Sequence, residues 1–201
     1  MKKKAIIVSI KGLRLTAKEK ILLSDEYPWG LILFKRNIKS LSQIQSLIND
    51  IKKLTKNKNF PILIDEEGST VSRLTNIINH NISANYFGNL YLINKKLCIQ
   101  LYKKYLDSLC KCLKRIGLNI NTIPVLDVLR VKTSSVIGTR SFSNNPNIVK
   151  ILGQITVNHC HKNKIISVIK HIPGHGCANL DSHIKLPKIK DSLNKLTIFK
   201  I

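Results

Sequence analysis

Short apolar runs alternate along this chain with longer amphipathic stretches. The apolar runs are rich in Ile, Leu and Val and predict β-strands that are covered on both faces. They are Ala5–Ile10, Gly30–Phe34, Pro61–Ile64, Leu118–Val125 and Ile165–Ile169. The amphipathic stretches predict helices over Thr16–Ser24, Leu41–Leu54, Leu90–Arg115 and Asn147–Lys162. Such alternation predicts an α/β fold with a parallel sheet, either an open doubly wound sheet or part of a (β/α)8 barrel.

Unusual polar residues follow the predicted strands and discriminate between these two architectures. Phe34–Asn37 follows the second strand, Asp65–Gly68 the third, Asp127 the fourth, and Lys170 and His171 the fifth. The carboxyl ends of all strands form the catalytic face of a barrel, whereas an open sheet concentrates its ligand contacts at one switch point. The pattern therefore favours a partial TIM-type barrel with about five βα units.

The composition is that of a folded domain with a strong positive charge. The chain has 201 residues, 43% of them hydrophobic, which is enough for a sizeable core in one domain over residues 1–201 or in part of a larger one. The formal net charge is +23. Most basic residues are Lys spread among many Ile and Asn, as in AT-rich coding sequences, without an Arg-rich face or a recognised nucleic-acid motif. We therefore expect no nucleic-acid partner.

Cysteine usage and the N-terminus point to a reducing compartment. The five cysteines are an odd number without a spaced framework, which predicts free thiols. The basic start Met1–Lys4 resembles that of a signal peptide, but the apolar run that follows is too short and ends at Lys11. No apolar run approaches the roughly 18 residues of a membrane span. We therefore expect a cytoplasmic location without membrane association.

The segment His171–Pro187 concentrates proton-transfer groups, because three histidines, one aspartate and two glycines follow directly on a predicted buried strand. Loops at strand ends carry the chemistry of many α/β enzymes. Asp181 and His183 project to the same side of an extended loop, so the carboxylate can hold one imidazole nitrogen and leave the other free. The pair is a candidate general acid and base. A simple loop cap is the alternative.

Two other site chemistries fit the sequence less well. His159 and His161 lie in a predicted helix, where residues two apart point to different faces and cannot share a metal ion. Cys110 and Cys112 lack a second pair, so we expect neither a metal site nor another cofactor. Ser182 lacks the glycines of a nucleophile elbow, which weighs against a serine hydrolase.

Six motifs occur in an order that resembles one enzyme family. They are Gly30–Asn37, Ile64–Gly68 with Val71–Leu74, Asn119–Asp127, Ile137–Phe142, Lys170–Gly176 and Asp181–His183. From Gly30 to Pro187 the chain resembles the N-terminal barrel domain of the family 3 glycoside hydrolases, in particular the bacterial β-N-acetylglucosaminidases (β-N-acetylhexosaminidases) of cell-wall recycling. The resemblance implies a retaining exo-β-N-acetylglucosaminidase that removes terminal β-linked N-acetylglucosamine from small peptidoglycan fragments.

The resemblance also implies roles for individual residues. Four residues would hold the sugar hydroxyls in the −1 subsite: Asp65, Arg140, Lys170 and His171. Arg73 matches the arginine that follows the family's acidic turn and would brace Asp65 at the substrate site. Asp181 and His183 would form the acid/base dyad on a mobile loop, which His175 would help to shape. Taken singly, such residues are more often caps or surface ion pairs, and only the joint pattern favours a site.

The chain departs from the family pattern at two places. Gly68–Thr70 stands where the family commonly has Gly-Gly-Arg, so this loop lacks a basic group and a flexible backbone position of the family pattern. The strand with the family's nucleophilic aspartate would lie beyond Ile201, after a helix or turn over Ser192–Ile201, and neither Asp181 nor Asp191 matches it. We therefore expect a barrel domain truncated at its C-terminus, inactive alone and open to completion by a second chain. The alternatives are another family 3 exo-glycosidase and a non-enzymatic basic binding protein or truncated remnant.

Overall fold

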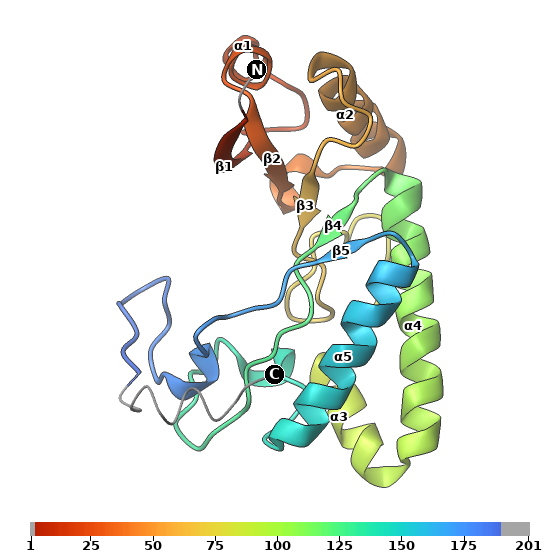
Figure 1. Cartoon of the computed structure of the whole chain (residues 1–201), viewed down its shortest axis with the longest axis vertical. Coiled ribbons are helices and arrows are strands. Elements are labelled where there is room, and N and C mark those ends of the chain that lie inside the picture. The colour runs from red at the N-terminus through yellow and green to blue at the C-terminus, as the bar shows by residue number, and fades with distance from the viewer. Residues whose placement is uncertain (1–2, 190–201) are drawn as a thin grey trace.

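Five parallel strands form one sheet in the computed structural model, which describes residues 3–189 (Figure 1). They are β1 (Lys4–Ser9), β2 (Pro28–Leu33), β3 (Ile62–Ile64), β4 (Ile120–Asn121) and β5 (Ile166–Ser167). Their order in the sheet is their order in the chain, and every neighbouring pair is parallel. A doubly wound sheet reverses its strand order at a switch point, whereas a barrel adds each strand on the same side of the last. The topology is that of part of a (β/α)8 barrel, as predicted.

Helices connect the strands, with α2, α4 and α5 along one side of the sheet (Figure 1). The α-helices are α1 (Ala17–Asp25), α2 (Leu41–Leu54), α3 (Ala84–Ile93), α4 (Lys95–Ile116) and α5 (Pro146–Lys162), and the short 3-10 helices are η1 (Lys35–Asn37), η2 (Gly138–Arg140) and η3 (His175–Cys177). The single helix predicted over Leu90–Arg115 is wrong. Asn94 ends α3, and its side chain caps α4 by accepting the Leu97 N–H at 3.0 Å.

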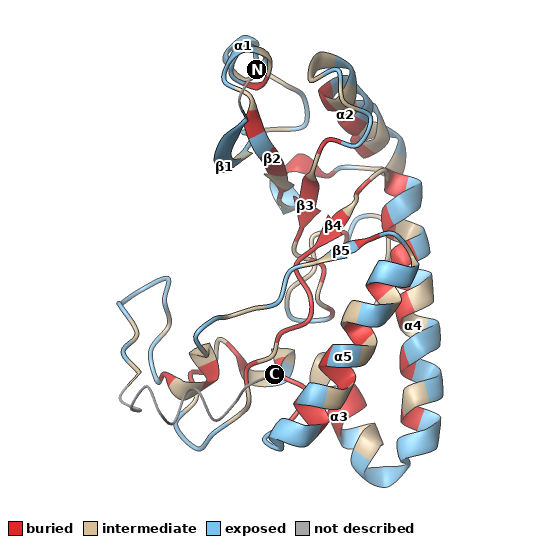
Figure 2. Cartoon of the chain, in the orientation of Figure 1, coloured by how far each residue is buried: buried red, intermediate tan, exposed pale blue. Residues whose placement is uncertain are grey.

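The core lies between the sheet and the helices, where buried residues face one another (Figure 2). Its fully buried members include Leu31, Ile62 and Ile64 from the sheet, Ile44 and Ile48 from α2, and Leu106 and Leu113 from α4. Shortening one such side chain to Ala typically costs about 2–5 kcal/mol of stability. This layer holds β3 rigidly at the point where the polar residues begin.

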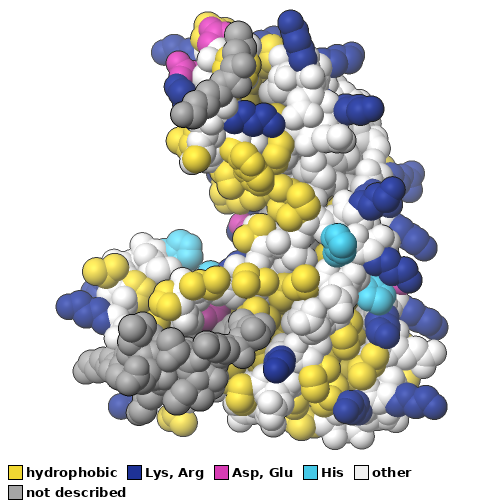
Figure 3. Space-filling model, viewed as in Figure 1, with side chains coloured by type: hydrophobic (Ala, Val, Ile, Leu, Met, Phe, Trp, Pro, Cys, Tyr) yellow, Lys and Arg dark blue, Asp and Glu magenta, His cyan; other side chains and the backbone are white. Residues whose placement is uncertain are grey.

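The two edge strands are less covered than the sequence predicts. Ile6 of β1 is 52% exposed and Ile166 of β5 is 58% exposed. Figure 3 shows hydrophobic side chains on both rims of the hollow between the β1–β2 region and the chain that follows β5. The expectation that all five strands are covered on both faces is therefore wrong for β1 and β5, because within residues 3–189 no further element packs beside either edge.

Regular pairing between β4 and β5 is also shorter than the apolar runs suggest, with two residues in each strand. Pro124 interrupts it because proline has no N–H to donate to a ladder. The two segments nevertheless run on side by side. Val125 forms an isolated bridge with Lys170, and the Leu126 N–H donates to the Lys170 carbonyl at 2.7 Å. The residues after β4 and after β5 therefore reach the same edge of the sheet.

Two expectations concern the C-terminal end of the chain, which the structure does not describe. Asp191 and the helix or turn predicted over Ser192–Ile201 lie outside the described residues. Across the part that the structure describes, no helix is both long and apolar enough to cross a membrane.

Candidate active site

The acidic segment Asp65–Glu67 begins the site directly after β3. Glu66 is completely buried and does not face the site. Its carboxylate accepts four hydrogen bonds, from the backbone N–H groups of Arg73 and Leu74 at 2.8 and 3.0 Å, the Ser72 hydroxyl at 2.6 Å and His80 Nε2 at 2.7 Å. These bonds close the loop that follows β3. Because alternate residues of an extended segment point to opposite sides, Asp65 and Glu67 both face away from this buried cluster.

Asp65 is held by groups from three other segments. Thr122, just after β4, donates its hydroxyl to Oδ1, Lys170 Nζ lies 3.4 Å from Oδ1, and Arg73 Nη2 lies 3.4 Å from Oδ2. Burial alone would raise the pKa of Asp65, but the Thr122 hydrogen bond and the charges of Lys170 and Arg73 outweigh burial and lower the pKa. Asp65 is therefore an ionised acceptor at neutral pH. The Asp65 side chain is 19% exposed, so a ligand can reach it.

Glu67 links two of the predicted sugar-binding cations. Its carboxylate pairs with Arg140 in a two-pronged contact, with Nε at 2.8 Å and Nη2 at 2.9 Å, and also contacts Lys170 Nζ. Burial alone would lower the pKa of the Arg140 guanidinium, but the Glu67 hydrogen bonds and charge raise the pKa above its usual value. This geometry fixes the guanidinium plane as well as its position.

His171 connects Arg140 to a buried carboxylate after β4. Its Nδ1 lies 2.6 Å from Asp127 Oδ2, and its Nε2 lies 3.1 Å from Arg140 Nη2. Arginine can only donate, so Nε2 is an acceptor and the ring proton is on Nδ1, which donates to Asp127. Burial would raise the pKa of Asp127, but the hydrogen bonds from His171 and from the Gly176 N–H lower it. The imidazole is therefore held at both ring nitrogens.

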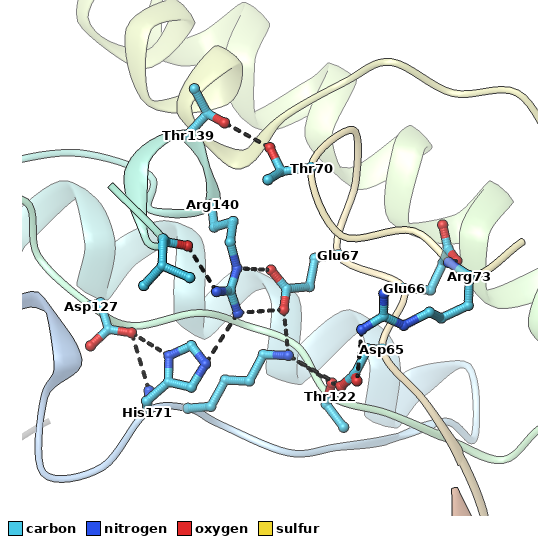
Figure 4. Close-up of polar contacts among 12 residues, drawn as sticks. Asp65, Glu66, Glu67, Thr70, Arg73, Thr122, Asp127, Thr139, Arg140 and His171 are labelled. Carbon is cyan, nitrogen blue, oxygen red and sulfur yellow. Dashed lines mark hydrogen bonds and ion pairs between the residues drawn. The ribbon is translucent and has the colours of Figure 1, made fainter. Parts of the chain in front are cut away.

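A continuous network therefore runs through the predicted substrate-binding residues, as Figure 4 shows. It joins Arg73, Asp65, Lys170, Glu67, Arg140, His171 and Asp127. The cations and carboxylates alternate, so charge is balanced inside the network. The side chain of Lys170 is 15% exposed and that of His171 is 31% exposed, so the network is open on one side. It offers both donors and acceptors at fixed positions.

The acidic loop is also anchored to η2. Gly68 has a φ of +148°, and a Cβ there would lie 2.4 Å from the Ile82 carbonyl oxygen, so only glycine fits. The Ser69 N–H donates to the same carbonyl at 3.2 Å, and the hydroxyls of Thr70 and Thr139 are 2.8 Å apart. A hydroxyl pair thus holds this loop at the position where the family commonly has a basic residue.

The Asp181–His183 pair forms as the spacing predicts, but outside this network. His183 Nδ1 lies 2.7 Å from Asp181 Oδ1, and the His183 backbone N–H donates to the same oxygen at 2.9 Å. These hydrogen bonds, the backbone one first, lower the pKa of Asp181. The His183 side chain is 78% exposed, and no hydrogen bond or ion pair among residues 3–189 joins it to the network. Its acid/base role stays a prediction.

A small cavity lies behind the network, between α3, α4 and η2. Its volume is about 20 Å³, and Glu67, Arg140, Phe87 and Phe142 contribute to its walls. This space suits a single water and is far too small for a sugar ring. Over the described ranges, no three His, Cys, Asp or Glu side chains are grouped so as to hold a metal ion.

Sequence reasoning missed several residues that build the site: Glu66, Glu67, His80, Thr122 and, as a partner of His171, Asp127. The spacing indicates one of them, Glu67, because a residue two positions from Asp65 lies on the same side of an extended segment. The remaining contacts join residues that are far apart in the chain.

A family model described as the glycosyl hydrolase family 3 N terminal domain matches residues 3–200. The chain belongs to this family. The resemblance inferred from the six motifs is confirmed, as is the glycoside hydrolase lineage. The β-hexosaminidase of Idiomarina loihiensis is 33% identical over 192 residues, which are 95% of this chain and 56% of that protein. Beta-hexosaminidase A of Pseudoalteromonas piscicida is 32% identical over 173 residues, 83% of this chain and 28% of that protein.

Solved structures of family 3 enzymes share the fold. The native NagZ from Neisseria gonorrhoeae matches with a TM-score of 0.88 and 31% identity, over 98% of this chain and 57% of that chain. The same protein in complex with N-trifluoroacetyl-D-glucosamine matches with a TM-score of 0.89 and 31% identity, over 98% of this chain and 56% of that chain. This family 3 chain therefore spans about half, or less, of the length of these relatives.

Proposed function

We propose that this chain contributes the sugar-binding and acid/base groups of a retaining exo-β-N-acetylglucosaminidase that acts on peptidoglycan fragments. The observation that carries the proposal is the network of Asp65, Glu67, Arg140, Lys170 and His171 at the carboxyl ends of the strands. Family membership and the relative solved with N-trifluoroacetyl-D-glucosamine support the same conclusion.

The charge balance of the network favours a neutral polyol as its ligand. Glu67 already pairs with Arg140 and Lys170, and Asp65 already pairs with Lys170 and Arg73, so little net charge is left to attract an anion or a cation. Asp65 can accept hydrogen bonds from two adjacent sugar hydroxyls, while Lys170 and Arg140 keep N–H groups that can donate. The sugar ring is thereby oriented through its hydroxyls.

In this proposal His183 protonates the glycosidic oxygen and then deprotonates the attacking water, while Asp181 holds its Nδ1–H. A general acid at this step contributes about 10²–10⁴-fold in rate. Because the dyad lies on an exposed loop, closure over the bound sugar is part of the mechanism. His171 already donates to Asp127 and accepts from Arg140, so it has no free proton for this role.

A retaining reaction also needs a carboxylate nucleophile about 5–5.5 Å from the acid/base group. The network carboxylates described above are each engaged in ion pairs or hydrogen bonds, which fits sugar binding better than attack on carbon. We therefore assign the nucleophile to polypeptide other than residues 3–189, joined to this chain or supplied by a second one. The exposed apolar rims at β1 and β5 support such a completing segment. Within residues 3–189 no disulfide joins the cysteines, which fits a reducing compartment.

A chimaera provides the test, with residues 3–189 replacing the matching part of the NagZ from Neisseria gonorrhoeae. We expect release of p-nitrophenol from p-nitrophenyl N-acetyl-β-glucosaminide, and a fall in kcat/KM of about 10- to 100-fold on Asp65→Asn, which removes a charged acceptor. Asp50→Asn is the matched control, because Asp50 is exposed on α2.

The unfused chain should release no p-nitrophenol but should bind N-acetylglucosamine in equilibrium dialysis. A chimaera that prefers a β-glucoside would favour a different family 3 exo-glycosidase. Hydrolysis by the chain alone, or sugar binding unaffected by Asp65→Asn, would contradict the proposal.

A further inference from the structure

His175 carries an unexplained pair of polar atoms beside the network. Both ring nitrogens are buried, and neither has a hydrogen-bond partner among the described residues. At least one of them bears a proton at any pH. Most buried polar side-chain atoms in folded proteins are paired, and an unpaired one costs free energy. Such a residue points to a partner that arrives in another state of the protein.

Backbone contacts fix the segment that carries His175. The His175 N–H donates to the His171 carbonyl at 3.2 Å, and the next residue, Gly176, donates its N–H to Asp127 at 2.8 Å. A Cβ on Gly176 would lie 2.4 Å from the Val128 carbonyl oxygen, so the close approach of these two segments depends on glycine. The preceding residue, Gly174, has a φ of +137°, a backbone conformation that favours glycine.

The His175 ring contacts the sugar-binding network, and His175 stands on the same loop as the dyad. It packs edge-on against His171, with ring centroids 5.8 Å apart. In the dyad, Asp181 Oδ1 accepts both hydrogen bonds from His183, and within residues 3–189 no hydrogen bond reaches Asp181 Oδ2. His175 and Asp181 are thus six residues apart on one loop, and each has a polar side-chain atom without a hydrogen-bond partner among residues 3–189.

We propose that His175 is a positioning residue for the acid/base dyad, which donates a ring N–H to Asp181 Oδ2 when the loop closes over bound sugar. Asp181 would then be held on both oxygens, by His183 on one and by His175 on the other, and the free His183 nitrogen would be aimed at the glycosidic oxygen. Because His175 also contacts His171, the dyad docks next to an occupied sugar site. This inference rests on the proposed function and deepens it.

The experiment compares His175→Leu with His175→Gln in the chimaera. Leu fills the site without a donor, whereas Gln keeps an N–H donor near the position of Nε2. Using a substrate with a poor leaving group, we expect Leu to lower kcat about 10²-fold with KM within twofold, and Gln to restore most of the rate. His161→Leu is the control, because this exposed histidine on α5 makes no side-chain contact with the site.

A double variant distinguishes positioning from independent structural damage. If His175 acts through the dyad, adding His175→Leu to His183→Ala should lower kcat no further. Additive losses, or a His175→Leu enzyme with unchanged kcat, would overturn the inference. His175→Leu should also keep the thermal midpoint and the affinity for N-acetylglucosamine, and a loss of either would make the residue merely structural. A chimaera in which His183→Ala has no effect would instead overturn the proposed function.

Discussion

Replacing Asp127 with Asn tests how strongly the site depends on one buried carboxylate. Asp127 is 2% exposed and accepts the His171 Nδ1–H at 2.6 Å, the Gly176 N–H at 2.8 Å and the His171 N–H at 3.3 Å. An Asn side chain has one acceptor oxygen, so its NH₂ group must face one of these donors. Hydrogen bonds to charged groups contribute about 1.5–3 kcal/mol each. The substitution removes one such bond and leaves an NH₂ group facing an N–H donor, so it should lower the free energy of unfolding by about 2–4 kcal/mol.

The substitution should also change the state of His171. If the ring moves its proton to Nε2 to avoid the new NH₂ group, Nε2 can no longer accept from Arg140, and the network is broken at that point. Urea unfolding would measure the stability loss, and ¹⁵N NMR of the imidazole would report the tautomer. Asp50→Asn makes the same chemical change at an exposed position and should shift stability by less than about 0.5 kcal/mol. A loss below about 1 kcal/mol for Asp127→Asn, with the proton still on Nδ1, would refute the reasoning.

Three further results are expected. Gly88→Ala would place a Cβ 1.7 Å from the Phe142 carbonyl oxygen, so α3 must move and stability should fall by about 1–3 kcal/mol or more in urea unfolding; a neutral result would contradict the packing. Asp65 and Asp127 have lower pKa values in the folded protein than in the unfolded chain. Their contribution to the free energy of unfolding is therefore complete above the unfolded pKa near 4, and it is lost as the pH falls through the folded pKa values. On acidification, the Asp127→Asn variant should therefore lose less stability than the parent chain. The exposed apolar β5 edge predicts that the purified chain self-associates, and Ile166→Lys should reduce this self-association in sedimentation experiments; unchanged self-association would show that it does not involve β5.

Apolar periodicity predicted the strands and most helices well, because burial against one layer imposes a regular pattern. The helix α2 has the same bounds as the amphipathic run. The break at Asn94 was missed since the apolar pattern continues across it, and only the capping geometry separates α3 from α4. The exposure of β1 and β5 was also missed. An apolar strand has the same composition at the edge of a sheet as at its centre. Whether the strand is buried depends on which helices and strands pack beside it.

The site was predicted in part. Asp65, Lys170 and His171 were found because they follow strands and match family motifs, and the structure brings them together. Glu66 and Glu67 could not be separated by residue type. Which of two adjacent carboxylates is buried and which one binds Arg140 depends on how the segment leaves β3, and contacts with distant residues determine that path.

A crystal structure of this chain with N-acetylglucosamine would test the central claim most directly. We expect the sugar ring on the open side of the network, with its hydroxyls within hydrogen-bond distance of Asp65, Lys170, Arg140 and His171. The network side chains should keep their present contacts, because their positions are already fixed without sugar. A sugar bound elsewhere on the chain, or an empty network at saturating sugar, would contradict the account.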